Sequence, residues 1–352
     1  MQEPKLMSQK KPSFPVNETL HNYLTTYNRS TKIPVFYDDL LRFSGSVAIY
    51  DKHEEDTLWV GCYYSDFEKD EIDESLKKVY TILHSDGKTS NLDFLNIDAI
   101  DFCTFGNSKP FRIKIRNILN DNFTYFYVKK ADASRIYGLD FEHILSPHRI
   151  NFLVYKDTLI EEHISGIPGD IFIKENLEDC DYLEKAQIAK QFVKFNERCT
   201  LRLLGDMRSY NYVIIPTHDF DHVDYKIRAI DFDQQSYEGK LNVYRPQFFK
   251  ENYTMVKLVE NHLEESSILQ YKKEERSQVA KRLITSEKRF RMLIRSMIKD
   301  KVSTEENVTQ LKNELVEFTK DINFKKANSM GHILKTALDF VKRNYLEYDE
   351  NY

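Results

Sequence analysis

The stretch LRLLGDMRSYNYVII, residues 201–215, decides how this chain is interpreted. Two apolar runs flank a short loop that carries an acid, a base and an amide: Asp206, Arg208 and Asn211. Asp206 alone could simply cap a turn, which aspartate does well. A connector between a helix and a strand, however, does not need all three groups at this spacing. The loop is therefore a candidate functional site.

The composition is that of an ordinary globular protein. A chain of 352 residues, 41% hydrophobic and 30% charged, is long enough for two domains or one large bilobal domain. Its net charge of -5 argues against a dedicated nucleic-acid-binding protein. The four cysteines lack the paired spacing of a zinc site or a disulfide framework. No apolar run resembles a signal peptide or a membrane span, so we expect a cytoplasmic protein without membrane or nucleic-acid partners.

Periodicity along the chain predicts a mixture of strands and helices. Residues 1–15 are polar and contain prolines, so we expect a flexible tail. Strands are predicted where β-branched and aromatic residues alternate, and helices where apolar residues recur at helical spacing. The predicted strands are residues 46–51, 57–64, 111–117, 122–130, 150–155, 158–164, 210–215 and 225–232; the predicted helices are residues 69–84, 134–147 and 182–204, with helix throughout from about residue 250.

The order of these segments resembles the protein-kinase-like superfamily. A hairpin strand ending in lysines precedes a helix with a central glutamate, two strands and a Gly/Pro linker at residues 165–170. A long helix, a D-x-x-x-x-N loop and a strand ending in Asp-Phe-Asp follow. The G-D form of the loop is closest to small-molecule kinases of the aminoglycoside and choline phosphotransferase type, where protein kinases have H-R-D-x-x-x-x-N. The resemblance covers roughly residues 100–240.

This resemblance implies an α+β fold with two lobes, an antiparallel-sheet N-lobe and a mainly helical C-lobe. The implied division is an unplaced N-terminal α/β region at residues 16–100, an N-lobe at 101–165, and a C-lobe with a helical extension at 166–352. The implied activity is an ATP- and Mg²⁺-dependent phosphotransferase that acts on a hydroxyl group of a small molecule or a protein.

The same resemblance assigns roles to the residues of the loop and the next strand. Phosphoryl transfer depends mainly on positioning and on charge neutralisation. Asp206 holds the position of the catalytic base, which orients the attacking hydroxyl. Asn211 and Asp231 hold the positions of the Mg²⁺ ligands, and Mg²⁺ prefers oxygen ligands. Arg208 lies where protein kinases keep a lysine against the transferred phosphate.

The N-terminal half contains the implied nucleotide-binding residues. Lys129 or Lys130, at the end of YFYVKK, matches the lysine that contacts the nucleotide phosphates, and strand register favours Lys129. Glu142 would be the helix glutamate that pairs with this lysine. Gly106, the single glycine of TFGNSKPF, lies where the phosphate-covering loop would be. The backbone near Glu162 would form the hinge that binds adenine.

Each assignment has a plainer alternative. Lys129 and Lys130 could be solvated residues at a strand end, and Glu142 an ordinary surface glutamate. Residues 217–224, THDFDHVD, mix histidine and aspartate as metal sites do, but their position between two strands predicts an acidic hairpin turn. Asp-Phe-Asp lacks the glycine of D-F-G, and no A-P-E element follows it. There are two competing interpretations. One is an inactive pseudokinase-like nucleotide-binding or scaffolding module, and the other is a helical interaction protein.

Residues 272–301 form a strongly basic segment. Its basic face could simply be solvated, or it could dock an anionic substrate or an acidic partner. Helical spacing of the apolar residues predicts a helix that packs one face on the core. These residues are Val279, Leu283, Phe290, Leu293, Ile294 and Met297.

Overall fold

The computed structural model describes residues 11–84, 89–106, 108–220 and 223–345. The chain divides into two compact units, which are considered separately. Unit 1 comprises Met1–Ala133 and Ile150–His163, and unit 2 comprises Ser134–Arg149 and Ile164–Tyr352. The expected mixture of an antiparallel sheet in one part and mainly helices in another is confirmed.

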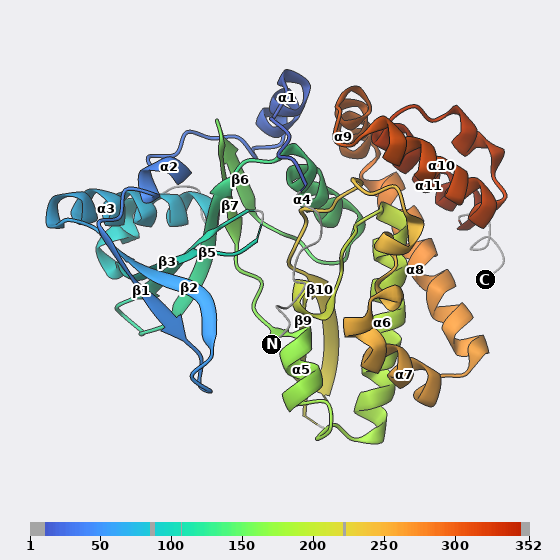
Figure 1. The fold of residues 1–352 in the computed structure, drawn as a ribbon, viewed down its shortest axis with the longest axis horizontal. Coiled ribbons are helices and arrows are strands. Elements are labelled where there is room, and N and C mark those ends of the chain that lie inside the picture. The colour runs from blue at the N-terminus through green and yellow to red at the C-terminus, as the bar shows by residue number, and fades with distance from the viewer. Residues whose placement is uncertain (1–10, 85–88, 107, 221–222, 346–352) are drawn as a thin grey trace, which may run out of the picture. The chain divides into compact units, whose positions relative to one another are not determined.

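Unit 1 is built on a seven-stranded antiparallel sheet with the strand order β1-β2-β3-β4-β5-β7-β6 (Figure 1). Helices α1 (Glu18–Thr26), α2 (Tyr37–Leu40) and α3 (Asp66–His84) accompany the sheet, and a 3-10 turn spans Thr89–Phe94. The strands are β1 (Gly45–Tyr50), β2 (Asp56–Tyr63), β3 (Leu95–Cys103), β4 (Phe111–Asn117), β5 (Phe123–Lys130), β6 (Phe152–Tyr155) and β7 (Thr158–Glu162).

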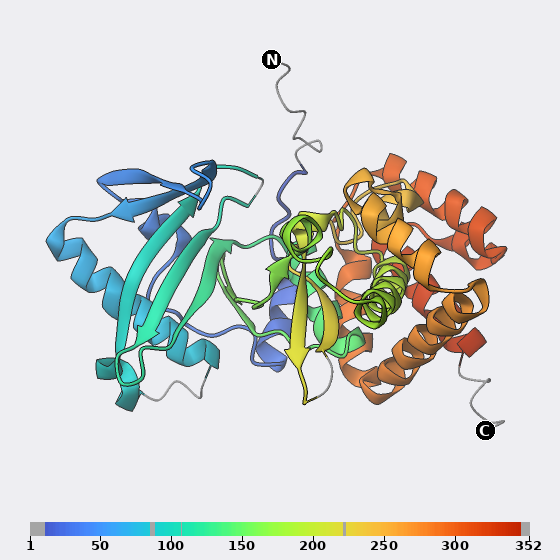
Figure 2. The same cartoon turned by 90° about the horizontal axis from the view of Figure 1, so that it is seen from below.

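Alternation along the strands gives this sheet one apolar face. On β4, Phe111 and Ile113 are buried in the core, whereas Arg112 between them belongs to the opposite face. Helix α3 contributes Ile72 and Leu76 to the same core at i, i+4 spacing. Figure 2 shows α3 running along the sheet on this side. The sheet face that carries Lys129 is therefore the one opposite the core.

The expected boundary at residue 100 does not separate two domains. Leu76 and Ile97, which precede it, share one core with Phe126, which follows it. Residue 100 itself lies inside β3, which pairs with β4. Because an antiparallel sheet is held together by hydrogen bonds between successive strands, residues 16–100 fold together with the predicted N-lobe.

The predicted tail at residues 1–15 is wrong in its last part. Residues 1–10 lie outside the described residues. Lys11 is buried, and its Nζ lies 2.9 Å from Asp132 Oδ1. The Phe14 N–H donates to Asp132 Oδ2 at 2.9 Å, and the Phe14 carbonyl accepts from the Ala133 N–H at 2.8 Å. These bonds attach residues 11–15 to the end of β5, a long-range contact that local composition cannot indicate.

Unit 2 is mainly helical around a small antiparallel sheet of order β10-β9-β8 (Figure 1). The strands are β8 (Ile167–Pro168), β9 (Tyr212–His218) and β10 (Val223–Ala229). The α-helices are α4 (Ala133–Leu145), α5 (Gly169–Glu175), α6 (Tyr182–Arg202), α7 (Tyr253–His262), α8 (Glu265–Thr285), α9 (Glu287–Lys299), α10 (Glu305–Thr319) and α11 (Met330–Tyr345). Short 3-10 turns span Ser209–Asn211, Leu241–Tyr244, Pro246–Phe248, Lys250–Asn252 and Ile322–Lys326.

Helix α6 positions the loop quoted above. It begins with a capping box, in which Asp181 accepts from the Glu184 N–H at 2.8 Å and Glu184 accepts from the Asp181 N–H at 2.9 Å. It ends at Leu203, whose φ of 54° turns the chain out of the helix. The buried face of α6, with Phe192 and Phe195, packs against β10 and the helices α7 and α8.

The C-terminal region is helical as predicted, but the basic segment is not one helix. Residues 272–301 are divided between α8 and α9, with a break at Ser286. The apolar residues Val279, Leu283, Leu293 and Met297 are buried as expected, while Phe290 is only partly buried. Among the described residues, no helix combines the length and apolar character needed to cross a membrane.

Candidate active site

The loop between α6 and β9 holds three of the predicted site residues in unit 2. Asp206 has a φ of 58°, in the left-handed region that aspartate tolerates better than most residues. Asn211 Nδ2 donates to the Asp206 carbonyl oxygen at 2.7 Å, and the Asn211 N–H donates to the Arg208 carbonyl at 2.9 Å. The loop is thus closed on itself. The nitrogen of the Asn211 side chain is used in this closure, so its amide oxygen is the atom that could bind a metal ion.

Gly205 allows the loop to lie close to the segments that follow β10. Its N–H donates to the Gln234 carbonyl at 3.1 Å. A Cβ at position 205 would lie 3.1 Å from that same oxygen and 3.1 Å from Val243 Cγ1. The next N–H, of Asp206, donates to the Val243 carbonyl at 3.0 Å. These close contacts explain why glycine occupies position 205, because any side chain there would displace the neighbouring atoms.

Arg208 connects the candidate base to a second carboxylate. Its Nε donates to Asp206 Oδ1 at 2.7 Å, and its Nη1 donates to Glu251 Oε1 at 2.8 Å. Burial raises the pKa of Asp206; the Arg208 guanidinium partly offsets this rise, and the Glu251 carboxylate adds to it. Glu251 Oε2 is buried without a hydrogen-bond partner among the described residues. Asp206 is therefore a largely buried carboxylate that faces one cation and one further anion.

The charge of Asp206 also affects the pKa of two more groups of unit 2. Burial raises the pKa of Glu238, and the charge of Asp206 is the next largest cause. Burial also raises the pKa of Tyr210; Arg208 lowers it, and the carboxylates of Asp206, Glu251 and Asp231 raise it further. The sequence analysis missed Tyr210, Glu238 and Glu251. Tyr210 lies inside the quoted loop, whereas nothing in the local pattern distinguishes the two glutamates from surface residues.

Asp231 follows β10 and lies beside Asn211. Strands β9 and β10 pair Tyr212 with Ala229. One residue further on, the Ile230 N–H donates to the Asn211 carbonyl at 3.0 Å. Asn211 and Asp231 therefore lie next to the neighbouring ends of two paired strands, and the sharing of one ion by their side chains stays a prediction.

Arg135 of α4 bridges Asp231 and Asp233. Its Nη1 lies 2.8 Å from Asp231 Oδ1 and 2.6 Å from Asp233 Oδ1. The Arg135 side chain is 2% exposed, whereas the Asp231 side chain is 35% exposed. The Asp233 N–H also donates to Asp231 Oδ1 at 3.1 Å. The sequence analysis identified neither Arg135 nor Asp233, although Asp233 is the second aspartate of the quoted Asp-Phe-Asp.

The donor atoms at Asn211 and Asp231 fit Mg²⁺ in kind. An amide oxygen and a carboxylate are hard ligands, and the partial exposure of Asp231 leaves its carboxylate accessible to solvent. Within the part of the chain that the structure describes, no three His, Cys, Asp or Glu side chains gather as a metal-binding group. Mg²⁺ at such a site takes its other ligands from water or from substrate phosphates.

Lys129 is the buried lysine at the end of β5, and Lys130 is the exposed one. Lys129 Nζ lies 2.7 Å from Glu161 Oε2, and the two side chains are 7% and 5% exposed. Lys130 Nζ lies 3.1 Å from Asp38 Oδ1, where both side chains are more than half exposed. β5 directs Lys129 away from the core residues Phe126 and Val128, as the register predicted.

The structure gives Lys129 and Glu142 each a partner within its own unit, and a pair between these two residues stays a prediction. Glu142, on α4, forms a buried ion pair with Arg202 at the end of α6, while Lys129 pairs with Glu161. A buried charge needs a compensating partner, and each unit supplies one from within. Glu161 stands opposite Tyr127 in the pairing of β5 with β7, so it is a diagonal neighbour of Lys129.

Two further predicted residues lie in unit 1. Gly106 is in the loop between β3 and β4 and has a φ of 86°, a conformation that favours glycine. The following residue, Asn107, lies outside the described residues. Glu162 ends β7, and its N–H donates to the Asn151 carbonyl at 3.0 Å. The nucleotide-binding roles of Gly106 and Glu162 stay predictions.

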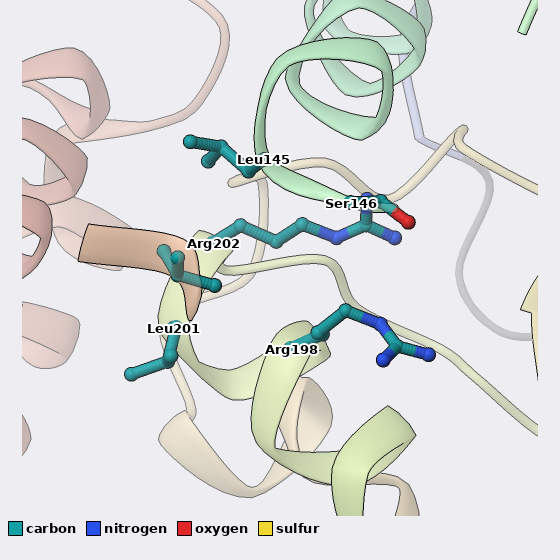
Figure 3. Close-up of a pocket in the computed structure, with 6 residues that line it drawn as sticks. Leu145, Ser146, Arg198, Leu201 and Arg202 are labelled. Atoms are coloured by element: carbon teal, nitrogen blue, oxygen red, sulfur yellow. The ribbon is translucent and has the colours of Figure 1, made fainter. Parts of the chain in front are cut away.

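A pocket in unit 2 is lined by two arginines of α6 (Figure 3). Arg198 pairs with Glu275 at 3.2 Å, and Arg202 pairs with Glu142. Burial lowers the pKa of Arg202 to about 9. The pocket has no room for a water molecule between its side chains, so it is not the candidate substrate site. Its lining residues are Leu145, Ser146, Arg198, Leu201, Arg202 and Val279.

Comparison with known proteins does not assign the chain. No family model matches the sequence, and no match was found among curated proteins. Function must therefore be inferred from the chemistry of the site itself.

Proposed function

We propose that this protein is an ATP- and Mg²⁺-dependent phosphotransferase with a kinase-like arrangement of its chain, acting on a hydroxyl group of a small molecule or a protein. One observation carries the proposal. Asp206, Asn211 and Asp231 gather at the adjoining ends of the α6–β9 loop and β10, linked by hydrogen bonds from Asn211 Nδ2 to the Asp206 carbonyl and from the Ile230 N–H to the Asn211 carbonyl.

The order of elements supports the proposal. The hairpin β4–β5 ends at the lysine pair, and α4, β6 and β7 follow it along the chain. Next come the linker with β8 and α5, the long helix α6, the loop, and the hairpin β9–β10 that ends just before Asp231. Apart from β8 and α5, which the sequence analysis did not predict, these elements lie close to where they were expected, and this succession is the one that the kinase-like resemblance implies.

In the proposed reaction Asp206 orients the acceptor hydroxyl and takes its proton. A carboxylate whose pKa is raised by burial is a better proton acceptor than a solvated one. Arg208, held at 2.7 Å from Asp206, carries the positive charge that faces the transferred phosphoryl group. The bond from Arg208 to Glu251 fixes the guanidinium in this place.

Asn211 and Asp231 would hold the Mg²⁺ ion, and Lys129 would contact the nucleotide phosphates. When bound, the ion supplies positive charge that offsets the phosphate oxygens. Lys129 lies on the sheet face opposite the core, and Glu161 fixes its ammonium group. Gly106 and the backbone near Glu162 are proposed to contact the nucleotide in the same unit.

The non-catalytic alternative is favoured by one observation. Arg135 donates to Asp231, the carboxylate that would bind the ion, and to Asp233 beside it. A guanidinium at this position competes with a metal ion for the same oxygen atoms. A pseudokinase-like module that keeps the fold but transfers no phosphate would have this feature.

The test uses the full-length protein. Binding of Mg²⁺-ATP is measured by calorimetry and by the rise in melting temperature, because a ligand that binds only the folded state stabilises it. ADP formation is then followed with a panel of hydroxyl-bearing small molecules, and phosphorylation of the protein itself by mass spectrometry. Binding with transfer supports the proposal. Binding without transfer to anything supports the pseudokinase-like alternative, and no binding of any nucleotide contradicts both.

A further inference from the structure

We propose that Arg135 is an internal cation that prevents the carboxylates of Asp231 and Asp233 from holding a divalent ion on their own. The metal ion then enters the site together with the nucleotide, not before it. The statement about the nucleotide rests on the proposed function; the statement about Arg135 and metal affinity does not.

The contacts of Arg135 place one positive charge between two negative ones. Oxygen atoms of Asp231 and Asp233 both lie within hydrogen-bond distance of a single nitrogen, Arg135 Nη1, at 2.8 Å and 2.6 Å. The two oxygens are therefore close to each other. Two neighbouring carboxylates repel when both are ionised, and they attract a divalent cation strongly. Arg135 relieves the repulsion and weakens the attraction.

The position of Arg135 is fixed by close packing in unit 2. Gly138, one turn further along α4, has no side chain, and a Cβ there would lie 3.0 Å from Phe232 Cβ and 3.1 Å from Gln235 Cβ. Ser134 Oγ donates to the Gln235 carbonyl at 2.8 Å. The Arg135 side chain is 2% exposed and lies 2.8 Å from Asp231 Oδ1, so a metal ion at Asp231 would bind next to this cation.

A bound nucleotide would make metal binding at Asp231 more favourable. An ion at Asp231 would gain the Asn211 amide oxygen but no third acidic, histidine or cysteine ligand among the described residues. Phosphate oxygens complete the coordination sphere in such sites, and their negative charge offsets that of Arg135. Metal and nucleotide should then increase each other's affinity by the same factor, as linkage requires.

Binding of Mn²⁺ to the full-length protein, measured by electron paramagnetic resonance, tests the proposal without turnover. Wild type should bind Mn²⁺ at least roughly tenfold more tightly with a non-hydrolysable ATP analogue than without it, a typical size for coupled sites. Arg135→Met should bind Mn²⁺ alone at least about tenfold more tightly than wild type, because the competing cation is gone. Arg135→Lys keeps the charge and should behave like wild type.

Arg289→Met is the matched control. Arg289 of α9 lies 2.6 Å from the buried carboxylate of Asp140, which is on α4 like Arg135. Arg289→Met therefore also removes an arginine from a buried ion pair, but not one that involves Asp231 or Asp233. This variant should show the Mn²⁺ affinity of wild type. The proposal would be overturned if Arg135→Met and wild type bound Mn²⁺ with equal affinity. It would also be overturned if wild type bound the ATP analogue but its Mn²⁺ affinity were the same with and without it. If wild type binds no nucleotide, the proposed function fails, while the Mn²⁺ affinity of Arg135→Met still decides the role of Arg135.

Discussion

Two charged clusters, one in each unit, differ in how far their side chains are exposed to solvent. In unit 1, Lys129 and Glu161 form an ion pair whose side chains are 7% and 5% exposed. In unit 2, Arg135 is as deeply buried, but its partner Asp231 is 35% exposed. Both side chains of the first pair are buried, whereas the second pair leaves one carboxylate partly exposed to solvent. We therefore expect substitutions in unit 1 to change stability most, and those in unit 2 to change ligand binding most.

The largest expected effect is on the stability of unit 1. Lys129→Met removes one partner of a buried ion pair and leaves the Glu161 carboxylate buried, which costs about 3–5 kcal/mol. Lys130→Met, at an exposed pair, should cost less than about 1 kcal/mol. Equilibrium urea unfolding measures both, and the double variant Lys129→Met with Glu161→Leu should recover much of the loss. If the two single lysine substitutions lower the free energy of unfolding equally, the Lys129 pair is not buried in the way that the structure shows.

The next effect concerns metal and nucleotide binding in unit 2. Asp231→Asn removes the negative charge assigned to the ion, so Mn²⁺ affinity in the presence of an ATP analogue should fall by at least about tenfold. The free energy of unfolding without ligand should change less than in Lys129→Met. The exposed aspartate Asp339 on α11 provides the control Asp339→Asn, which should change neither quantity. Unchanged Mn²⁺ affinity in Asp231→Asn would remove this residue from the site.

A smaller effect is expected on the pH dependence of activity. Asp206 must be ionised to accept a proton, and its raised pKa means that activity falls with decreasing pH at a higher pH than an ordinary aspartate would give. Arg208 lowers this pKa, so Arg208→Met should move the acid limb of kcat/KM to higher pH.

Glu251→Gln should move the same limb in the opposite direction, because Glu251 raises the pKa of Asp206. The linkage to stability has a definite sign. A carboxyl whose pKa is higher in the folded state binds protons more tightly there, so Asp206 lowers stability above its folded pKa, and this cost disappears as the pH falls through that pKa. An acid limb that does not move in either variant would exclude Asp206 as its origin.

Local periodicity was sufficient for most elements of both units. The alternation FRIKIRN gave β4, and the spacing of apolar residues gave α3 and α6, because each pattern is set by burial of one face. The helix α4 was also predicted, but it was expected in the N-lobe, whereas nearly all of it belongs to unit 2. Which unit a helix packs on depends on contacts with residues distant in the sequence, such as Arg202 with Glu142.

The candidate site was predictable where its residues share one motif. Asp206, Arg208 and Asn211 lie within a single loop. Asp231 follows β10, which pairs with β9, the strand after this loop. Arg135, Glu161 and Glu251 were missed because each meets its partner only through tertiary structure. Lys129 with Glu161 depends on the pairing of β5 with β7, and Arg135 with Asp231 depends on the packing of α4. Neither contact leaves a local signal.

The most direct test of the proposed function compares Asp206→Asn with wild type in two quantities, the affinity for Mg²⁺-ATP and the rate of phosphoryl transfer. The substitution keeps the shape of the side chain but removes the charge that orients and accepts the hydroxyl proton. Affinity should stay nearly unchanged, whereas transfer should fall by roughly 10²–10⁴-fold. A catalytic role for this loop would be contradicted if wild type bound Mg²⁺-ATP but transferred phosphate neither to itself nor to any acceptor, and Asp206→Asn behaved in the same way.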